Sequence, residues 1–346
     1  MNKNKVTLED VRQLTLFGEV EDRDLTMIAH GLEQVSFAAG DYIFRQGEPA
    51  DSAIFIVDGE AEILTRLPGG DEMVVARVGA DALLGETSLL EESVRTASVR
   101  SDGPVTCFRM DRRFFHASVA QHDIAAFCIL RRIMSVMADR LRNLNMQIVE
   151  HVASSLSRPP EQMDLARRTA ALEQPAPFNF RAFLPVLPFF RDFRETDIDD
   201  MVALTRVFSL PKGVTLFEEG DESDSMFIVV RGALTMCCVD GGNLYPLEIA
   251  GPGKVCGADD VIAARSRARG CHSSSETTLL EITAADFQRL NTDRSLLSFL
   301  FQAALCDGQL ESLGRANRRL SHEITHTAMK KHCSIASLLK PGRAAS

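Results

Sequence analysis

A segment that occurs twice, about 173 residues apart, constrains the fold of this chain more than any other feature. The two copies share glycines at the same spacing, together with a few aromatic, acidic and basic residues. The matched pairs are Phe17/Phe190, Gly40/Gly213, Gly47/Gly220, Asp51/Asp224 and Gly59/Gly232 at an offset of 173, and Gly85/Gly257, Arg95/Arg267 and Phe115/Phe287 at an offset of 172. Glycines that keep their spacing indicate backbone positions with positive φ or a close neighbour. We therefore interpret the chain as two homologous domains.

Each copy shows the same succession of expected elements. A short helix, at 22–32 and again at 195–204, precedes short alternating strands, and a further helix follows them. Glycine-containing turn signals separate the strands. Hairpin turns are expected at Asp58-Gly59, at 68–71 and at 240–243. Because many short strands with glycine turns favour a sandwich or β-roll, we predict an α+β fold, mainly β with helices. It would contain two jelly-roll-like β-rolls, each followed by a long helix.

Composition narrows the class of protein. The 346-residue chain is 45% hydrophobic, which is ordinary for a soluble protein, and its net charge of −10 argues against nucleic acid as a partner. It contains no run of 18 apolar residues, and no apolar stretch follows the polar first residues. We therefore expect a cytoplasmic protein with no membrane span or secretory signal. The eight cysteines show no disulfide or zinc spacing, and Cys237 and Cys238 are expected to be buried thiols.

The first copy contains a pattern suited to a small ligand with hydroxyl groups at one end and a phosphate at the other. Residues 85–88 read Gly-Glu-Thr-Ser, and their backbone N–H groups can bind a phosphate. Arg95, ten residues after Gly85, can add charge-assisted hydrogen bonds to it. Glu86 would repel the phosphate, so we expect its carboxylate to accept from a ligand hydroxyl group. The alternative is that Glu86 and Arg95 form only an ion pair at a turn.

This pattern resembles the phosphate-binding cassette of cyclic-nucleotide-binding domains, which occur in catabolite activator proteins, protein kinase A regulatory subunits and cyclic-nucleotide-gated channels. The resemblance covers about residues 12–150 and again 185–320, most of the chain. In the first copy it is carried by the runs 40–48, 56–59, 85–86 and 95–98.

The resemblance implies a role for each cassette residue. Glu86 would bind the ribose 2′-hydroxyl, and Arg95 would bind the cyclic phosphate. The implied nucleotide-binding residues are Leu84, Gly85, Glu86, Thr87, Arg95, Thr96 and Ala97, with Leu144 and Asn145 near the base. Thr96 is similar to the threonine of cGMP-selective members, yet bacterial cAMP binders also carry serine or threonine there. We favour cAMP as the ligand, with cGMP as the alternative, and expect no other cofactor.

The second copy departs from the family pattern. Ala258 stands where the first copy has Glu86, and alanine cannot hold a ribose hydroxyl. Because a lost charged hydrogen bond costs about 1.5–3 kcal/mol, we expect this degenerate site to be empty or to bind something else, with a structural or docking role. The degenerate site comprises Gly257, Ala258, Arg267 and Ala268, accompanied by the basic Arg265 and Arg269 and the acidic pair Asp259 and Asp260.

The domain boundaries follow from the repeat and from a helix break at the prolines of 157–160. We expect a first cyclic-nucleotide-binding domain with a dimerisation helix at 1–152, a linker at 153–185, a degenerate second domain at 186–325 and a flexible tail at 326–346. The linker is expected to contain a short helix at 161–172 with Arg167 and Arg168 on its solvated face. Heptad spacing predicts a homodimer through parallel helices. Its seam would be Leu130, Met134, Met137, Leu141, Leu144, Ile148 and His151, with a similar pattern at Cys306, Leu310, Leu313, Asn317, Leu320 and Ile324.

These expectations describe a receptor that is not an enzyme. Residues after 320 lack the pattern of a DNA-reading helix pair, and no kinase motif is present. We expect nucleotide binding at the first domain to reach an unidentified protein partner through helix and domain rearrangement. A second hypothesis is a nucleotide-independent scaffold that uses both β-rolls for docking.

A third hypothesis is a metalloprotease-like tail. Residues 322–326 match H-E-x-x-H, a pattern that places two histidines on one helix face, and His332 has the spacing of a third ligand. The glycine needed to turn the chain toward that ligand is replaced by Met329. We therefore treat His322, His326 and His332 as weak metal candidates, and expect no metal and no catalytic residues.

Overall fold

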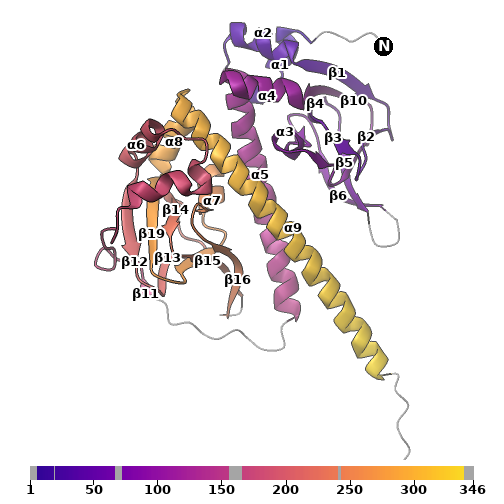
Figure 1. The fold of residues 1–346 in the computed structure, drawn as a ribbon. Helices are drawn as coiled ribbons and strands as arrows, with labels where there is room; N and C mark the ends of the chain where they lie inside the picture. Colours follow the sequence, from indigo (N-terminus) through magenta and orange to yellow (C-terminus); the bar gives the residue numbers. More distant parts are fainter. Residues whose placement is uncertain (1–5, 19, 67–71, 156–165, 241–242, 339–346) are drawn as a thin grey trace, which may run out of the picture. The chain divides into compact units, whose positions relative to one another are not determined.

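The computed structural model describes residues 6–18, 20–66, 72–155, 166–240 and 243–338 (Figure 1). These residues form two compact units. The first runs through Val136 and includes Arg294–Phe299, and the second contains Met137–Asp293 and the chain from Leu300 onward. Each unit contains one copy of the repeat.

The first unit contains short entry helices, a β-roll and the start of a long helix. In chain order its elements are α1 (Leu8–Arg12), η1 (Thr15–Phe17), α2 (Asp22–His30), β1 (Leu32–Phe37), β2 (Tyr42–Phe44), β3 (Pro49–Ala50), β4 (Ser52–Asp58), β5 (Ala61–Arg66), β6 (Glu72–Val78), β7 (Leu83–Leu84), α3 (Thr87–Leu90), β8 (Ser93–Val94), β9 (Ser98–Ser101), β10 (Val105–Asp111), α4 (Arg112–Gln121) and α5 (Ile124–Ser155). Helix α2 confirms the expected helix at 22–32 to within two residues.

The β-roll of the first unit consists of two four-stranded sheets and a two-stranded ribbon. The sheets have the strand orders β1-β10-β4-β7 and β2-β9-β5-β6, and β3 pairs with β8. Apolar side chains from both sheets, among them Ile54, Ile56, Val99 and Cys107, form one buried cluster. The alternation of inward and outward side chains along each strand places these residues in the core.

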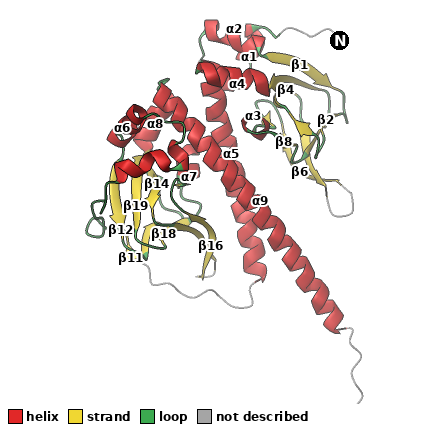
Figure 2. Cartoon of the chain, in the orientation of Figure 1, coloured by secondary structure: helices red, strands yellow, loops and turns green. Residues whose placement is uncertain are grey.

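The second unit repeats this arrangement. Its elements are β11 (Ala166–Arg167), η2 (Phe180–Val186), η3 (Pro188–Phe190), α6 (Glu195–Ala203), β12 (Arg206–Leu210), β13 (Val214–Phe217), β14 (Ser225–Arg231), β15 (Leu234–Asp240), β16 (Asn243–Ala250), β17 (Val255–Cys256), α7 (Ala258–Ile262), β18 (Gly270–Ser273), β19 (Thr277–Thr283), α8 (Ala284–Thr292) and α9 (Leu296–Leu338). Figure 2 shows strands gathered in each roll and the two long helices α5 and α9. The predicted α+β fold is confirmed.

The two four-stranded sheets of the first unit have counterparts in the second, whereas the β3–β8 ribbon has none among the described strands. The second unit has the orders β12-β19-β14-β17 and β11-β13-β18-β15-β16, so that only β11 is added. The matched glycines have matched conformations: φ is +82° at both Gly40 and Gly213, and +70° and +75° at Gly85 and Gly257. This positive φ is the physical reason why glycine keeps its spacing in the two copies.

The turn at Asp58-Gly59 differs from the expected hairpin. Strands β4 and β5, which flank it, belong to different sheets, so the turn carries the chain from one sheet to the other. Gly59 has φ +92°, and a Cβ there would lie 2.4 Å from the carbonyl oxygen of Pro104. The turn signal was therefore correct, but the pairing inferred from it was wrong. The other two expected hairpins form, since β5 pairs with β6 and β15 with β16.

The linker segment also differs from the expectation. Its described part is strand β11 followed by turns, not the helix predicted over 161–172, of which residues 161–165 lie outside the described ranges. β11 pairs in parallel with β13, and the Arg168 side chain forms ion pairs with Glu173 at 2.6 Å and Glu281 at 2.9 Å. Arg168 is therefore not on a solvated helix face, because two half-buried carboxylates hold it against the sheet.

Helix α5 is continuous across the point where the compact units divide, between Val136 and Met137. The sequence interpretation places the first boundary at 152. Met137, Leu141 and Ile148 of the expected dimer seam are at most 3% exposed within a single chain. A dimer through this seam would have to expose them, so the homodimer remains a prediction. The side chain of His151 lies outside those that the structure describes.

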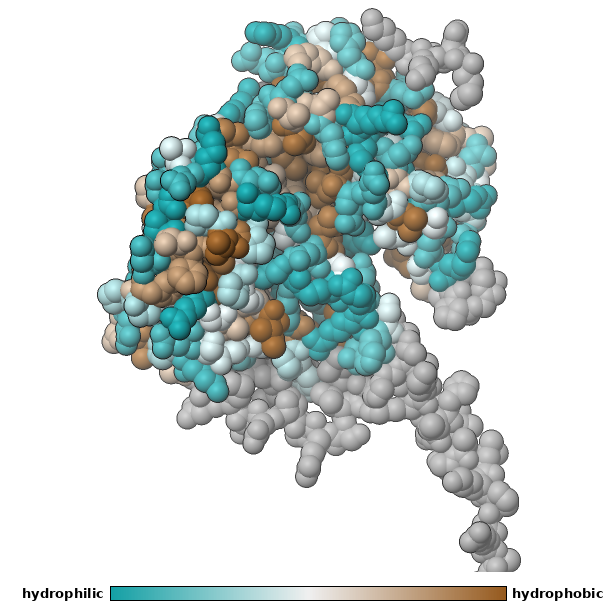
Figure 3. Space-filling model, viewed as in Figure 1, coloured by the Kyte–Doolittle hydropathy of each residue, from teal (hydrophilic) through white to brown (hydrophobic). Residues whose placement is uncertain are grey.

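The seven cysteines whose side chains the structure describes are buried free thiols, including Cys237 and Cys238 as predicted. Burial raises the pKa of these two thiols to about 11 and about 12. No helix among the described residues is long and apolar enough to cross a membrane. On the face drawn in Figure 3, hydrophilic side chains cover much of the outer surface of both units.

We expect Gly59→Ala to lower the free energy of unfolding by about 1–3 kcal/mol, because the new Cβ would meet the Pro104 carbonyl and strain a backbone with positive φ. Gly103→Ala is the matched control, since a Cβ there meets nothing within 4 Å and should change stability by less than about 0.5 kcal/mol. Urea unfolding followed by fluorescence of an attached dye measures both. Equal midpoints for the two variants would contradict the explanation of the turn.

Candidate functional site

The predicted cassette of the first unit is a tight loop between β7 and β8 that contains α3. Gly85 has φ +70°, and a Cβ there would lie 2.3 Å from a guanidinium nitrogen of Arg95. The glycine is thus needed both for the backbone conformation and for the close approach of the arginine. Helix α4 holds the loop from behind, because His116 Nε2 lies 2.8 Å from the Leu89 carbonyl and Arg112 donates to the carbonyls of Ser88 and Ala50.

Arg95 lies at the centre of this cassette. Its guanidinium donates to the Ser52 carbonyl at 2.7 Å and to the Ser52 hydroxyl at 3.2 Å, and it lies 3.4 Å from the Ser88 hydroxyl. The ring of Phe44 lies beneath it, 4.3 Å from the guanidinium carbon. These contacts fix the planar group in one orientation, as recognition of an oxyanion requires.

The electrostatics of Arg95 favour an incoming anion. The residue is only 7% exposed, and burial lowers the pKa of its guanidinium. Asp51 opposes that shift, but its side chain is 67% exposed and also pairs with Arg109. Water screens the charge of so exposed a carboxylate, which leaves the buried cation compensated mainly by neutral oxygens. An anionic group bound beside Arg95 would supply the missing charge.

The other predicted cassette residues lie in this loop or next to it, in β7 and in the segment between β8 and β9. Glu86 is buried, at 6% exposed, and directly precedes α3, while Leu84 is buried in β7. Thr87 and Ala97 are half-buried and Thr96 is exposed. The seven cassette residues thus lie in two segments, 84–87 and 95–97, which meet where Arg95 approaches Gly85. Their individual roles toward a nucleotide remain predictions.

The two residues predicted to lie near the base are placed differently. Leu144 and Asn145 lie on the part of α5 that belongs to the second unit. Leu144 is half-buried, and Asn145 is 6% exposed with its Nδ2 atom lacking a hydrogen-bond partner among the described residues. Sequence spacing could not indicate this, because α5 continues without a break from one unit into the other.

The second cassette has the same frame around its arginine. Arg267 donates to the Gly257 carbonyl at 2.9 Å and to the Ser225 carbonyl, and its guanidinium carbon lies 4.1 Å from the centre of the Phe217 ring. Burial again lowers its pKa. Ala258 is buried at 6% exposed, and the carboxylate that Glu86 provides in the first cassette is absent here. Ala268 follows the arginine in the loop before β18 and is half-buried.

The second cassette contains charged residues at its centre. The sequence interpretation treated them only as a basic loop and an acidic pair. Asp259, Asp260 and Arg269 are nearly or fully buried and stand at the positions of Thr87, Ser88 and Ala97. Burial raises the pKa of both carboxyl groups. The repeat could have revealed this, since an offset of 172 aligns three uncharged residues with three charged ones.

The H-E-x-x-H segment lies on α9. His322 is exposed, with Nδ1 3.9 Å from a carboxylate oxygen of Glu323. The side chains of His326 and His332 lie outside those described. Among the residues that the structure describes, no group of three or more histidine, cysteine or acidic side chains could hold a metal ion.

Comparison with known proteins identifies both copies. The family model described as "Cyclic nucleotide-binding domain" matches residues 34–122 and 207–293, together about half of the chain. Among curated relatives, the CRP-like cAMP-activated global transcriptional regulator of Mycobacterium tuberculosis is 28% identical over 135 residues, which cover 39% of this chain and 58% of that protein. The cAMP-dependent protein kinase regulatory subunit of Dictyostelium discoideum is 29% identical over 119 residues, which cover 34% of this chain and 36% of that protein.

The chain thus spans little more than a third to just over half the length of these curated relatives. A solved structure, the regulatory domain of Toxoplasma gondii protein kinase A with cAMP, is 17% identical, covers 83% of this chain and 91% of its own, and superposes with a TM-score of 0.30. The assignment rests on the two matches to the family model, which fall on the two β-rolls and include both cassettes. The chain belongs to the family of proteins with cyclic nucleotide-binding domains, and it contains two such domains in tandem.

Proposed function

We propose that this chain is a receptor for a cyclic nucleotide, with cAMP as the preferred ligand and cGMP as the alternative, and that it binds the nucleotide in the first cassette without catalysing a reaction. The observation that carries this proposal is Arg95. Its buried guanidinium is held in a fixed orientation, and its charge is offset only in part by the exposed Asp51. A cyclic phosphate would complete this site by binding the guanidinium in a charge-assisted manner.

The remaining cassette residues fit the same ligand. Glu86 provides a carboxylate that can accept hydrogen bonds from a ribose hydroxyl, and Gly85 leaves the space that Arg95 occupies. The curated relatives reported above are described as a cAMP-activated regulator and a cAMP-dependent kinase regulatory subunit, which supports cAMP over other small anions.

The receptor would relay its occupancy through α5. This helix follows the first β-roll and continues into the second unit, so a change in its position affects both. Leu144 and Asn145 would move onto the base when nucleotide binds, and the second unit would present the change to a protein partner. A ligand shifts such an equilibrium only by its difference in affinity for the two states. We propose action within the cytoplasm and no contact with nucleic acid.

Arg95→Ala should abolish cAMP binding measured by calorimetry, because it removes the only buried cation of the first cassette among the described residues. Arg95→Lys keeps the charge but loses the planar donor pair, and should weaken binding by about tenfold to a hundredfold. Arg23→Lys, on the exposed surface of α2, makes the same substitution away from both cassettes and should leave affinity unchanged. We expect one site per wild-type chain. Unaltered binding by Arg95→Ala would overturn the assignment, and no heat with either nucleotide would favour the scaffold hypothesis.

Glu86→Gln should weaken binding of cAMP by about tenfold, because a neutral amide is a poorer acceptor for a ribose hydroxyl than a carboxylate. The 2′-deoxy analogue of cAMP lacks that hydroxyl, so wild type and Glu86→Gln should bind the analogue with similar affinity. Calorimetric titration with both nucleotides forms a double-mutant cycle. A loss of the same size with the deoxy analogue would place Glu86 outside ribose recognition.

A further inference from the structure

The second cassette already contains the charges that the first cassette lacks. Asp260 stands at the position of Ser88, is 4% exposed, and is a source of negative charge for the buried Arg267. In the first cassette the corresponding Ser88 is neutral, and the acidic neighbours of Arg95, Asp51 and Glu48, are both exposed. The second cassette thus has a built-in anion beside its arginine, where the first would need one from a ligand.

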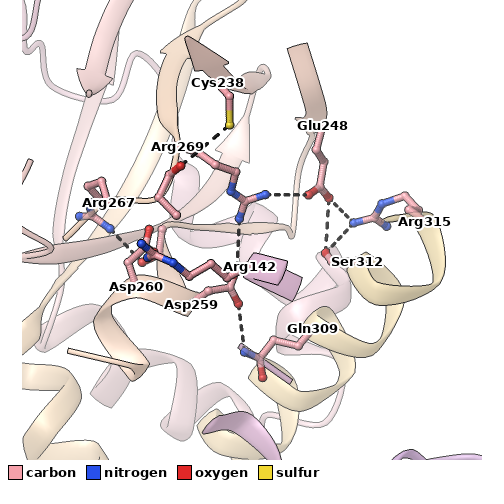
Figure 4. A network of polar contacts seen from close by, with 12 residues as sticks. Arg142, Cys238, Glu248, Asp259, Asp260, Arg267, Arg269, Gln309, Ser312 and Arg315 are labelled. Atoms are coloured by element: carbon pink, nitrogen blue, oxygen red, sulfur yellow. Dashed lines mark hydrogen bonds and ion pairs between the residues drawn. The ribbon is translucent and has the colours of Figure 1, made fainter. Parts of the chain in front are cut away.

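Side chains of the protein fill the rest of the second cassette. Arg269 bonds to Asp259 at 3.1 Å and lies 4.0 Å from Glu248. Helix α9 contributes Gln309, whose Nε2 donates to Asp259 at 3.0 Å, and Arg315, which pairs with Glu248. Figure 4 shows these groups converging from the sheet, the loop and α9 on one region.

The space that remains is far too small for a nucleotide. The cavity lined by this network, with Leu141 of α5 and Leu305 of α9 in its wall, has a volume of about 30 Å³. One water molecule occupies about 30 Å³ in the liquid, whereas ligand pockets measure roughly 300–1,000 Å³. The second cassette is therefore closed by parts of its own chain.

Helix α5 bonds directly to the loop of this cassette. Arg142 donates to the Asp260 carboxylate at 3.3 Å and to the Ser266 carbonyl at 3.2 Å. One turn earlier, Asp139 accepts from Arg265 at 2.7 Å. We call these five residues the α5 clasp. Both sets of contacts lie within the second unit.

The stretch of α5 next to the clasp carries buried side chains. Leu141, Asn145 and Ile148 lie on the same helix face and are at most 6% exposed in the second unit. This stretch includes Asn145 and adjoins Leu144, the residues that the proposed function assigns to the base in the first cassette. A side chain that is buried in the second unit cannot at the same time cover a base bound elsewhere.

We propose that the second cassette is a binding site for helix α5 of the same chain, which it holds through Arg142 and Asp260. This binding competes with the movement of α5 onto the base of a nucleotide bound in the first cassette. The clasped helix is the ligand-free state, and nucleotide binding draws the helix out of it. The competition rests on the proposed function, while the clasp itself does not. Only the fraction of chains with a released helix would bind nucleotide tightly, so the apparent affinity of the first site is reduced by that fraction.

Two variants and one control test this proposal. Asp260→Asn and Arg142→Gln each break the ion pair between Arg142 and Asp260. Each should raise the affinity for cAMP, measured by calorimetry, by about threefold to thirtyfold as the released fraction grows. Arg142 is half-buried, so its variant should fold even if the buried Asp260→Asn does not. Asp200→Asn, on the exposed surface of α6, makes the same charge change as Asp260→Asn and should leave the affinity unchanged.

A second measurement does not depend on nucleotide. Amide hydrogen exchange over residues 137–148 of the ligand-free protein should be faster in Arg142→Gln than in wild type or Asp200→Asn. The double variant with Asp260→Asn should exchange no faster than Arg142→Gln alone, because Arg142→Gln already removes the Arg142–Asp260 contact. Unchanged exchange would overturn the clasp. Faster exchange with unchanged cAMP affinity would overturn the competition. If the wild type binds no nucleotide, the proposed function is overturned, and the exchange rates still decide whether the clasp exists.

The closed second cassette makes a separate prediction. Ala258→Glu restores the carboxylate that the family pattern requires, yet the protein should still bind one nucleotide per chain, because Arg269, Asp259 and Gln309 occupy the space. Calorimetric stoichiometry measures this directly. Two sites per chain in Ala258→Glu would show that the cassette opens and would contradict its occupation by protein groups.

Discussion

A buried arginine guanidinium at the centre of each β-roll is the interaction on which the rest of this structure depends. Arg95 and Arg267 are both nearly inaccessible to water, and each lies over a phenylalanine ring and donates to a serine carbonyl of the neighbouring strand. A buried cation is costly unless it is paired. The glycine at the start of each loop has no Cβ, so the guanidinium can approach the backbone there. This explains why the glycine is matched in both copies.

The two copies meet the cost of burial in different ways. Around Arg95 the hydrogen-bonded oxygens are neutral, and this is the basis on which we propose that the site binds an external anion. Around Arg267 the carboxylate of Asp260 is buried nearby and in turn engages Arg142 of α5. In our proposals the same frame serves as a ligand site in one unit and as an internal docking site in the other. The difference arises from a few charged side chains and not from the backbone.

Local signals in the sequence predicted much of the fold and of the first site. Positive φ at matched glycines, the helix before each roll and the residues of the first cassette all follow from short-range patterns. The errors arose where a long-range pairing decided the outcome. Asp58-Gly59 is a genuine turn, but its flanking strands pair with β9 and β10 of distant sequence. The segment around Arg168 is a strand because Glu173 and Glu281 hold it on the sheet edge.

The sequence by itself determined that the chain contains two copies of one domain and that their ligand loops differ, because spacing and residue type are read directly from it. Only the tertiary structure decided what the second loop binds. Arg142 precedes Glu248 and Asp260 by more than 100 residues, Arg315 follows Asp260 by 55, and no periodicity links the four. They meet because the sheet, α5 and α9 fold onto one another within the second unit, where burial makes each charge require a partner.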